Sequence, residues 1–247
     1  MTKQIRVATG VTGLDEMLSG GLVPGSTVLV RGAPGCGKTS LGLLFLVYGA
    51  RNNDPGLFIS FEEFPASIHR DAESLGWNLA ELEEAGQLHL MFTTPQILLD
   101  SLASPQSALG RLMMDGGIQR VVLDSITHFA RLTDDPVKLR AIYNTIINGL
   151  KREGVTSLLL GEESRTPDPR QEPGKLSYVV DGIIMLRYVE VESAMQRALV
   201  VLKMRGSDHA KEIRRAEIRK GGMVVTDVFE GRENILSGIS HRTSAAR

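Results

Sequence analysis

The 247-residue chain is poor in the features that mark secreted or membrane-spanning proteins. Its one cysteine, Cys36, cannot form an internal disulfide, and a lone thiol fits a reducing compartment. No apolar run reaches the roughly 18 residues that a membrane span needs, and Met1–Gly10 lacks the apolar centre of a secretory signal. We therefore expect a cytoplasmic protein without a membrane span.

Charge of one sign and aromatic residues are also scarce. The formal net charge is −1 and only 5% of residues are aromatic, so no global field or stacking surface indicates nucleic acid as a partner. The length suits one large α/β domain. We expect a single domain over residues 1–240 and a polar, basic, disordered tail over residues 241–247.

Short apolar runs alternate with helical patterns along most of the chain, which predicts a doubly wound α/β fold with a mainly parallel central sheet. Three later segments, separated by polar or glycine turns, are expected to add antiparallel strands to one edge: Ala198–Met204, Glu212–Ile218 and Met223–Asp227. The expected parallel strands are Thr27–Arg31, Gly56–Ser60, Leu88–Phe92, Arg120–Leu123, Val155–Leu160 and Gly182–Leu186. The expected helices are Thr39–Ala50, Ala66–Leu75, Ile97–Met114 and Val137–Arg152.

The segment Gly32–Thr39, Gly-Ala-Pro-Gly-Cys-Gly-Lys-Thr, matches the phosphate-loop pattern G-x4-G-K-[ST], with an apolar strand before it and an apolar helix after it. Glycines let backbone N–H groups surround a β-phosphate, and the helix N-terminus adds partial positive charge. Lys38 can reach the β- and γ-phosphates, and the Thr39 hydroxyl can bind Mg²⁺. Cys36 needs only to be small, although a redox role is the alternative. The expected nucleotide-binding residues here are Gly32, Gly35, Cys36, Gly37, Lys38, Thr39 and Ser40.

Two acidic elements follow apolar strands. Asp124 ends the run Val121–Asp124, the arrangement of a Walker B aspartate that holds Mg²⁺ partly through water, although an aspartate after a strand can also cap the next helix. Glu62 and Glu63 follow the strand after the phosphate loop, where carboxylates can orient a water for attack on a γ-phosphate. The alternative for this pair is a solvated loop or a charge at a helix N-terminus.

These motifs together resemble the RecA-type ATPases and, within them, the KaiC circadian-clock ATPase family. The stretches Gly10–Asp15 and Gly20–Gly25 are similar to the start of such domains, and Lys203-Met204-Arg205-Gly206-Ser207 is similar to the family motif K-x-R-G-[ST]. The resemblance runs from about Thr9 to Gly238.

The resemblance implies homo-oligomeric rings, typically hexamers, with MgATP bound between neighbouring subunits. It implies that Lys203 and Arg205 reach phosphates on the adjacent subunit, as arginine fingers do, and that Ser207 and His209 lie near the nucleotide. Outward basic residues on a strand are the plain alternative for Lys203 and Arg205, and a structural role is the alternative for His209. The resemblance also makes Glu62 the favoured water-activating base, with Glu63 assisting.

The chain departs from the clock protein in two respects. It has one such domain, whereas the clock protein has two in tandem. The serine–threonine pair that is autophosphorylated in the second clock domain corresponds to Ser177-Tyr178, so only the serine is kept. Ser177 is therefore a candidate phosphorylation site, with an ordinary loop serine as the alternative.

The sequence supports three hypotheses of function. The first is a ring-forming ATPase with slow turnover and a regulatory role, acting with a protein partner that the sequence does not identify and with serine autophosphorylation as a variant. The second is a nucleotide-gated assembly module in which hydrolysis is incidental. The third is a DNA-handling motor, but the loop Ser164–Lys175 offers only Arg165, Arg170 and Lys175 and no aromatic residue, so nucleic acid is not an expected partner.

Overall fold

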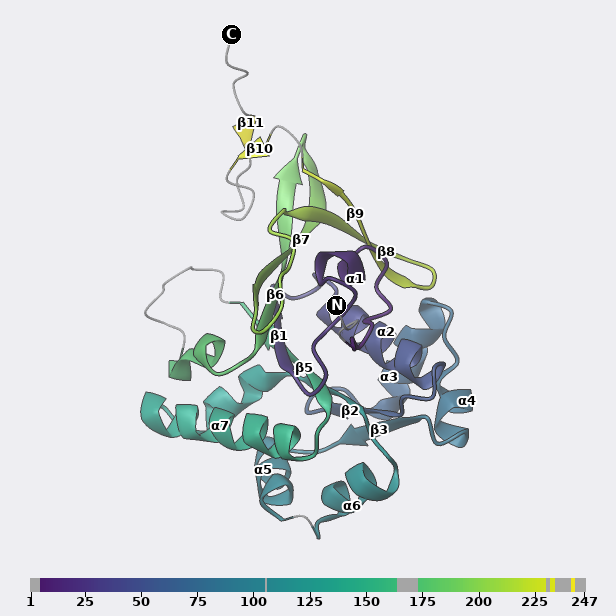
Figure 1. Ribbon diagram of the computed structural model, residues 1–247, viewed down its shortest axis with the longest axis vertical. Coiled ribbons are helices and arrows are strands. Elements are labelled where there is room, and N and C mark those ends of the chain that lie inside the picture. Colours follow the sequence, from purple (N-terminus) through teal and green to yellow (C-terminus); the bar gives the residue numbers. More distant parts are fainter. Residues whose placement is uncertain (1–4, 105, 164–172, 230–231, 234–240, 243–247) are drawn as a thin grey trace.

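A nine-stranded sheet forms the centre of the protein (Figure 1). The computed structural model describes residues 5–104, 106–163, 173–229, 232–233 and 241–242. The strand order is β3-β2-β4-β5-β1-β6-β7-β8-β9, parallel from β3 to β6 and antiparallel from β6 to β9. The predicted α/β class and the antiparallel edge are therefore confirmed. The strands are β1 (Thr27–Gly32), β2 (Gly56–Ser60), β3 (Leu88–Phe92), β4 (Arg120–Asp124), β5 (Thr156–Glu162), β6 (Gly182–Val191), β7 (Ala194–Met204), β8 (Arg214–Arg219) and β9 (Gly222–Val228).

Helices cover both faces of the parallel part of the sheet (Figure 1). One core lies between the sheet and α1, α2, α3 and α4, and the other between the sheet and α5, α6 and α7. Burial on two faces explains why the central strands are apolar without alternation. The helices are α1 (Leu14–Met17), α2 (Lys38–Ala50), α3 (Pro65–Ser74), α4 (Leu79–Glu84), α5 (Pro95–Ala103), α6 (Ala108–Asp115) and α7 (Pro136–Arg152), with the 3₁₀ helices η1 (Ile126–Leu132) and η2 (Pro173–Tyr178).

The antiparallel edge strands curl over α2. Met223 and Val225 of β9 belong to the same core as the apolar face of α2. Thr12 bridges to Val224, and the Val225 N–H donates to the Thr12 carbonyl oxygen at 2.8 Å. The glycine-rich N-terminal segment therefore joins β9, and α2 is enclosed between the sheet and its own edge strands.

The predicted single helix Ile97–Met114 is wrong, because the chain forms α5 and α6 instead. Ser104 ends α5 in an extended conformation, which agrees with the restriction that a following proline, Pro105, places on it. Ser107 then begins α6, because its side chain accepts a hydrogen bond from the Gly110 N–H at 2.9 Å. The short elements α1, α4, η1 and η2 were not predicted.

Arg120 is a charged side chain in the interior, with 2% of its surface exposed. One guanidinium nitrogen donates to the carbonyl oxygens of Ala8 at 2.7 Å and Phe45 at 3.0 Å, and the other pairs with Asp54 at 2.8 Å. The guanidinium also stacks over the Phe45 ring at 4.7 Å. This one side chain therefore connects β4, α2 and the N-terminal segment.

The C-terminal end of the described chain forms a separate two-stranded ladder. β10 (Arg232–Glu233) pairs antiparallel with β11 (His241–Arg242), so two residues of the expected disordered tail are placed in a strand. Residues 243–247 and the loop residues 164–172, including Arg165 and Arg170, lie outside the described residues. Among the described helices, none has both the length and the apolar character to cross a bilayer.

Candidate active site

The loop between β1 and α2 has the backbone that a phosphate loop requires. Gly35 and Gly37 have φ of 77° and 101°, in the region that favours glycine. A Cβ at Gly37 would also lie 2.7 Å from Ile218 of β8 and 2.8 Å from Met223 of β9. Side chains of β8 and β9 therefore pack against the loop where α2 begins, and they leave no room for a side chain at Gly37.

Lys38 and Thr39 face the carboxyl end of the sheet. The Lys38 ammonium is buried and donates to the carbonyl oxygens of Gly32 at 2.9 Å and Ala33 at 3.1 Å. The Thr39 hydroxyl donates to Asp124 Oδ2 at 2.7 Å. The phosphate loop and the end of β4 therefore meet as the sequence predicts.

Asp124 lies at the last position of β4 and is half-buried. Burial raises the pKa of its carboxyl, while the Thr39 hydroxyl and the Lys38 ammonium act in the opposite direction. A hydroxyl and a carboxylate are the oxygen ligands that Mg²⁺ takes in proteins, usually together with water and substrate phosphates. Within the described ranges no group of three His, Cys, Asp or Glu side chains could hold a metal. The Thr39 hydroxyl and the Asp124 carboxylate are two adjacent oxygen ligands, which fits Mg²⁺ bound together with nucleotide phosphates.

Cys36 and Ser40 were also expected to bind the nucleotide, and neither side chain is fully exposed. Cys36 is buried, and that burial raises the pKa of its thiol. A raised pKa leaves less of the reactive thiolate, which favours the small-residue interpretation over a redox role. Ser40, in the first turn of α2, is half-buried beside Thr39.

Glu62 and Glu63 are the second and third residues after the end of β2, next to Asp124. Ser60 pairs with Asp124 across the sheet, and the Ser60 hydroxyl accepts the Glu63 N–H at 2.9 Å. Partial burial, followed by the Asp124 carboxylate, raises the pKa of Glu63. Glu62 instead lies 3.0 Å from His128 Nε2. Both glutamates therefore lie beside the end of β4, but Glu63 is influenced by Asp124 and Glu62 contacts His128.

His128 is a site residue that the sequence analysis missed. It lies on η1, four residues after Asp124, and its side chain is only 9% exposed. The only sequence signal was that closeness to Asp124, because a lone histidine in a sequence rarely indicates a site.

Lys203 lies on β7, toward the end of the strands opposite the phosphate loop. Ile183 of β6 pairs with both Leu29 of β1 and Lys203 of β7. Leu29 is three residues before Gly32, so Lys203 lies about 10 Å down the strands from the loop and two strands across. The fold of one chain therefore does not bring Lys203 to its own phosphate loop.

Both cations of the K-x-R motif hold backbone oxygens of η2 and the turn after it. Lys203 Nζ donates to the carbonyl oxygens of Ser177 at 2.9 Å and Val180 at 2.7 Å. Burial, followed by the neighbouring Arg205, lowers the pKa of the Lys203 ammonium. A terminal nitrogen of Arg205 donates to the Tyr178 carbonyl oxygen at 2.9 Å. The candidate phosphorylation site Ser177 therefore lies beside these cations.

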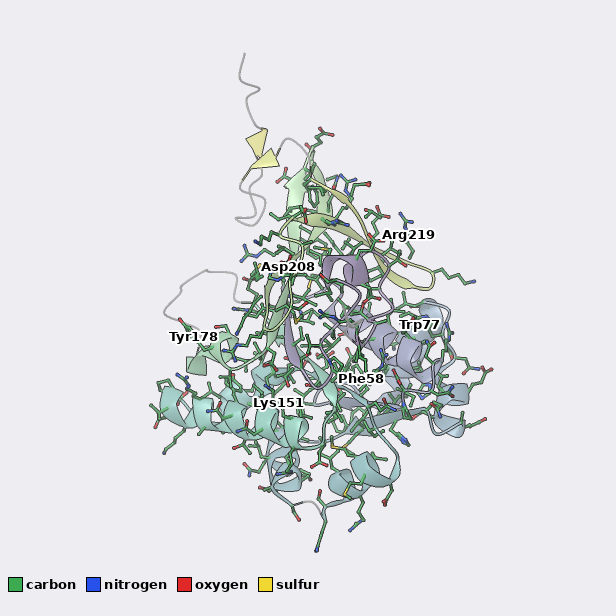
Figure 2. All side chains as sticks on the ribbon, in the orientation of Figure 1. Phe58, Trp77, Lys151, Tyr178, Asp208 and Arg219 are labelled. Carbon is green, nitrogen blue, oxygen red and sulfur yellow. The ribbon has the colours of Figure 1, made fainter. Side chains whose placement is uncertain are left out.

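Ser207 and His209 lie in the turn after β7, which packs near α1. The hydroxyls of Ser19 and Ser207 both donate to the Asp208 carbonyl oxygen, at 3.2 Å and 2.8 Å. In this part of the described chain, His209 Nδ1 is buried and makes no hydrogen bond. Asp208 lies apart from Tyr178 in Figure 2, although Arg205 at the start of this turn contacts η2.

Comparison with known proteins agrees with this arrangement. The family described as "ATPase: KaiC" matches residues 7–229, which include both sheet edges and every motif discussed above. The chain belongs to the KaiC ATPase family.

Relatives of two lengths match the chain. Circadian clock oscillator protein KaiC 1 of Synechocystis is 34% identical over 97% of this chain and 46% of its own length. UPF0273 proteins of Thermotoga maritima and Methanopyrus kandleri are 31% and 33% identical over 89% of this chain and over 95% and 91% of their own lengths. The chain thus spans about half of the clock protein and nearly all of these shorter relatives.

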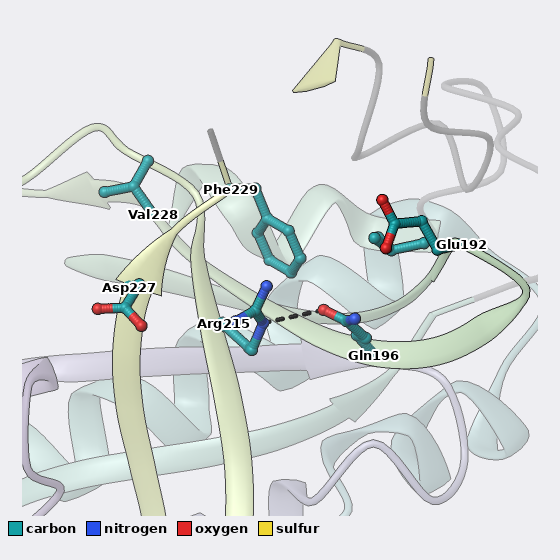
Figure 3. A pocket seen from close by; sticks show the side chains of 7 residues that line it. Glu192, Gln196, Arg215, Asp227, Val228 and Phe229 are labelled. Carbon is teal, nitrogen blue, oxygen red and sulfur yellow. Dashed lines mark hydrogen bonds between the residues drawn. The ribbon is translucent and has the colours of Figure 1, made fainter. Parts of the chain in front are cut away.

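A hollow of about 450 Å³ lies at the outer end of the antiparallel strands (Figure 3). Arg215 crosses it, donating to Gln196 at 2.9 Å and stacking on Phe229 at 5.2 Å. Val191, in its lining, is five residues beyond the β6 residue that pairs with Gly32, about 17 Å along the strand. This hollow is therefore separate from the phosphate loop.

Proposed function

We propose that the chain binds MgATP at Gly32–Thr39 and hydrolyses it slowly. The observation that carries the proposal is the 2.7 Å contact between the Thr39 hydroxyl and Asp124, with the Lys38 ammonium beside it. Thr39 and Asp124 would hold Mg²⁺, partly through water, and the ion would neutralise phosphate charge. Lys38 and the loop N–H groups would bind the phosphates.

Glu62 and Glu63 supply the carboxylates that hydrolysis needs beside this site. A base must accept a proton from the attacking water, and the raised pKa of Glu63 favours that transfer. Glu62, held by His128, is the favoured base, with Glu63 assisting. We therefore expect the carboxylates of Glu62 and Glu63 both to contribute to hydrolysis, and the loss of both to remove most of the catalysed rate.

We further propose that the active site is completed by a second copy of the chain. Lys203 and Arg205 lie at the end of β7, away from the phosphate loop of their own chain, with Ser207 and His209 in the following turn. When the surface around one subunit's phosphate loop binds the surface of the next subunit that carries Lys203 and Arg205, a head-to-tail ring forms. The resemblance to the KaiC family makes a hexamer the expected ring. Lys203 and Arg205 of one subunit would then stabilise the charge that develops on the phosphates bound to its neighbour.

The same arrangement would place Ser177 of one subunit beside the nucleotide of its neighbour. Its carbonyl oxygen accepts a hydrogen bond from Lys203 at 2.9 Å, so an interface that includes Lys203 would also include Ser177. We therefore keep serine autophosphorylation as a second activity of the proposed ring. Mass spectrometry after incubation with MgATP tests it directly.

The proposed hydrolysis is tested by phosphate release from the wild type, Glu62→Gln, Glu63→Gln and the double variant. We expect a loss of about 100-fold in the double variant, since general-base catalysis contributes roughly 10²–10⁴-fold. Glu84→Gln, on the surface of α4, is the matched control and should keep the wild-type rate. Equal rates in the wild type and the double variant would remove the pair from the reaction.

A further inference from the structure

His128 approaches Glu62 from the segment that follows the Mg²⁺-site strand. Its side chain is 9% exposed, whereas that of Glu62 is 60% exposed. His128 Nε2 lies 3.0 Å from Glu62 Oε1, and Arg131 lies farther from the same oxygen, at 3.8 Å, with 75% of its side chain exposed. The histidine is therefore the rigid partner, and the glutamate is the side chain that it can orient.

The peptide backbone around His128 is fixed by hydrogen bonds from two strand ends. The His128 N–H donates to the Ser125 carbonyl oxygen at 3.2 Å, and the Ser125 hydroxyl accepts the Thr127 N–H at 3.1 Å. The Thr127 hydroxyl in turn accepts the Glu162 N–H at the end of β5, at 2.9 Å. η1 is thereby attached to β4 and to β5.

Aromatic packing fixes the imidazole itself. The Phe61 ring meets the imidazole edge-on with a centroid distance of 5.7 Å, and meets Phe129 edge-on at 5.4 Å. Phe61 directly precedes Glu62, and its N–H donates to the Asp124 carbonyl oxygen at 3.1 Å. The histidine, the glutamate and the Mg²⁺-site aspartate therefore lie in one packed unit.

We propose that His128 is a positioning residue for ATP hydrolysis, and that its Nε2–H donates to Glu62 Oε1 so that Oε2 is aimed at the attacking water. This inference rests on the hydrolysis proposed above. In the reaction, the water oxygen bonds to the γ-phosphorus, the bond to the oxygen of ADP breaks, and the water proton goes to Oε2. His128 itself exchanges no proton in this step.

The physical reason is the freedom of an exposed glutamate. Such a side chain samples many rotamers in water, and only some of them direct a carboxylate oxygen toward the phosphate loop. A hydrogen bond from a fixed donor restricts these rotamers before substrate arrives, and correct orientation of a reacting group strongly affects rate. His128 thus performs for Glu62 the function that the third member of a catalytic triad performs for its base.

The test compares two polar replacements. In His128→Gln the amide nitrogen stands near the position of Nε2 and can still donate to Glu62. In His128→Asn the side chain is one methylene shorter, so its amide nitrogen does not reach Glu62. We expect His128→Asn to slow single-turnover hydrolysis about 10-fold and His128→Gln to stay within about 3-fold of the wild type. Nucleotide affinity should change less than about 2-fold, because neither variant touches the phosphate loop.

A double-mutant cycle identifies the partner. In the Glu62→Gln background, His128→Asn should cause no further loss of rate, whereas in the Glu63→Gln background it should slow the reaction as it does in the wild type. A signal independent of activity comes from the ¹⁵N NMR spectrum of histidine-labelled protein without nucleotide. There, Glu62→Gln should shift the His128 Nε2 resonance and Glu84→Gln should not.

Three results would overturn the inference while leaving the proposed hydrolysis intact. These are equal rates in His128→Asn and His128→Gln, an undiminished effect of His128→Asn in the Glu62→Gln background, and an unchanged Nε2 resonance in Glu62→Gln. Absence of any hydrolysis by the wild type is a different result, because it removes the proposed function and this inference with it.

Discussion

Asp124 is an ionisable side chain at a position where burial disfavours its charged form. It is a carboxyl at the end of a buried strand, and burial raises its pKa. The Thr39 hydroxyl and Lys38 offset only part of that effect. A binding site for Mg²⁺ at this position therefore reduces the stability of the protein without the ion, as functional sites often do.

A raised pKa means that the folded protein binds this proton more tightly than the unfolded chain does. Without Mg²⁺, the contribution of Asp124 to stability must therefore fall as pH rises above the ordinary aspartate pKa of about 3.9. Asp124→Asn removes this titration. We expect the variant to have the higher unfolding temperature at pH 7, with the difference shrinking toward pH 4.

Thermal unfolding with EDTA across this pH range measures the effect of Asp124→Asn. A gain of a few degrees is expected, since 1 kcal/mol moves the midpoint of a domain of this size by roughly 2–4 °C. Addition of MgATP should stabilise the wild type more than the variant. A variant less stable than the wild type at pH 7 would contradict this account of Asp124.

At the scale of elements, the site depends on how β4, α2 and the N-terminal segment are joined. Arg120 makes that connection through the Ala8 and Phe45 carbonyl oxygens and the Asp54 carboxylate. Replacement by alanine would leave these acceptors without their donor and would open a cavity. Loss of one member of a buried charged pair typically costs about 3–5 kcal/mol, and the low end applies here because the Asp54 side chain is 33% exposed.

We therefore expect Arg120→Ala to lower the free energy of unfolding by about 3 kcal/mol or more, measured by urea denaturation. Arg219→Ala is the control, because Arg219 is 56% exposed and its ion pair with Glu217 lies on the surface, where such pairs contribute about 0–1 kcal/mol. Figure 2 shows Arg219 at the outside of the edge strands. Equal losses in the two variants would contradict the structural role given to Arg120.

The elements that the sequence predicted well are those with a strong local pattern. β2 and β3 begin and end where predicted, because their apolar runs are bounded by polar and turn residues. The division between α5 and α6 was missed because the apolar pattern continues across it, although the proline at 105 was a visible signal. α1 and α4 have only four and six residues, too few for a helical period to be seen.

The candidate site was predictable where a motif has fixed spacing, as from Gly32 to Thr39. The contact of Thr39 with Asp124 followed from the rule that parallel strands end at one edge of a sheet. The pairing of His128 with Glu62 was not predictable, because it joins two strand ends that are distant in sequence and depends on side-chain packing. Contacts of Lys203 and Arg205 with η2 were missed for the same reason.

At the scale of the whole molecule, the central claim is that one subunit supplies the phosphate loop and its neighbour supplies the cations. Within one chain the two sets of residues lie two strands apart and toward opposite ends of the strands, and Lys203 and Arg205 contact η2 in their own chain. Their loss could therefore act locally rather than across an interface. A measurement of the central claim must separate these two effects.

Mixing two inactive variants separates them most directly. Lys38→Ala lacks a functional phosphate loop but keeps Arg205, whereas Arg205→Ala keeps the loop and lacks the cation. In rings formed from equal amounts, about one quarter of interfaces would join an intact loop to an intact Arg205. Co-assembly of the two variants with MgATP, verified by native mass spectrometry, is the condition under which phosphate release is measured.

We expect each variant alone to be inactive and the mixture to recover about one quarter of the wild-type rate, because each restored site draws on both chains. A mixture of well-formed rings that stays as inactive as its parts would contradict the trans-acting site, and so would a wild type that remains monomeric at saturating MgATP yet hydrolyses it at the full rate.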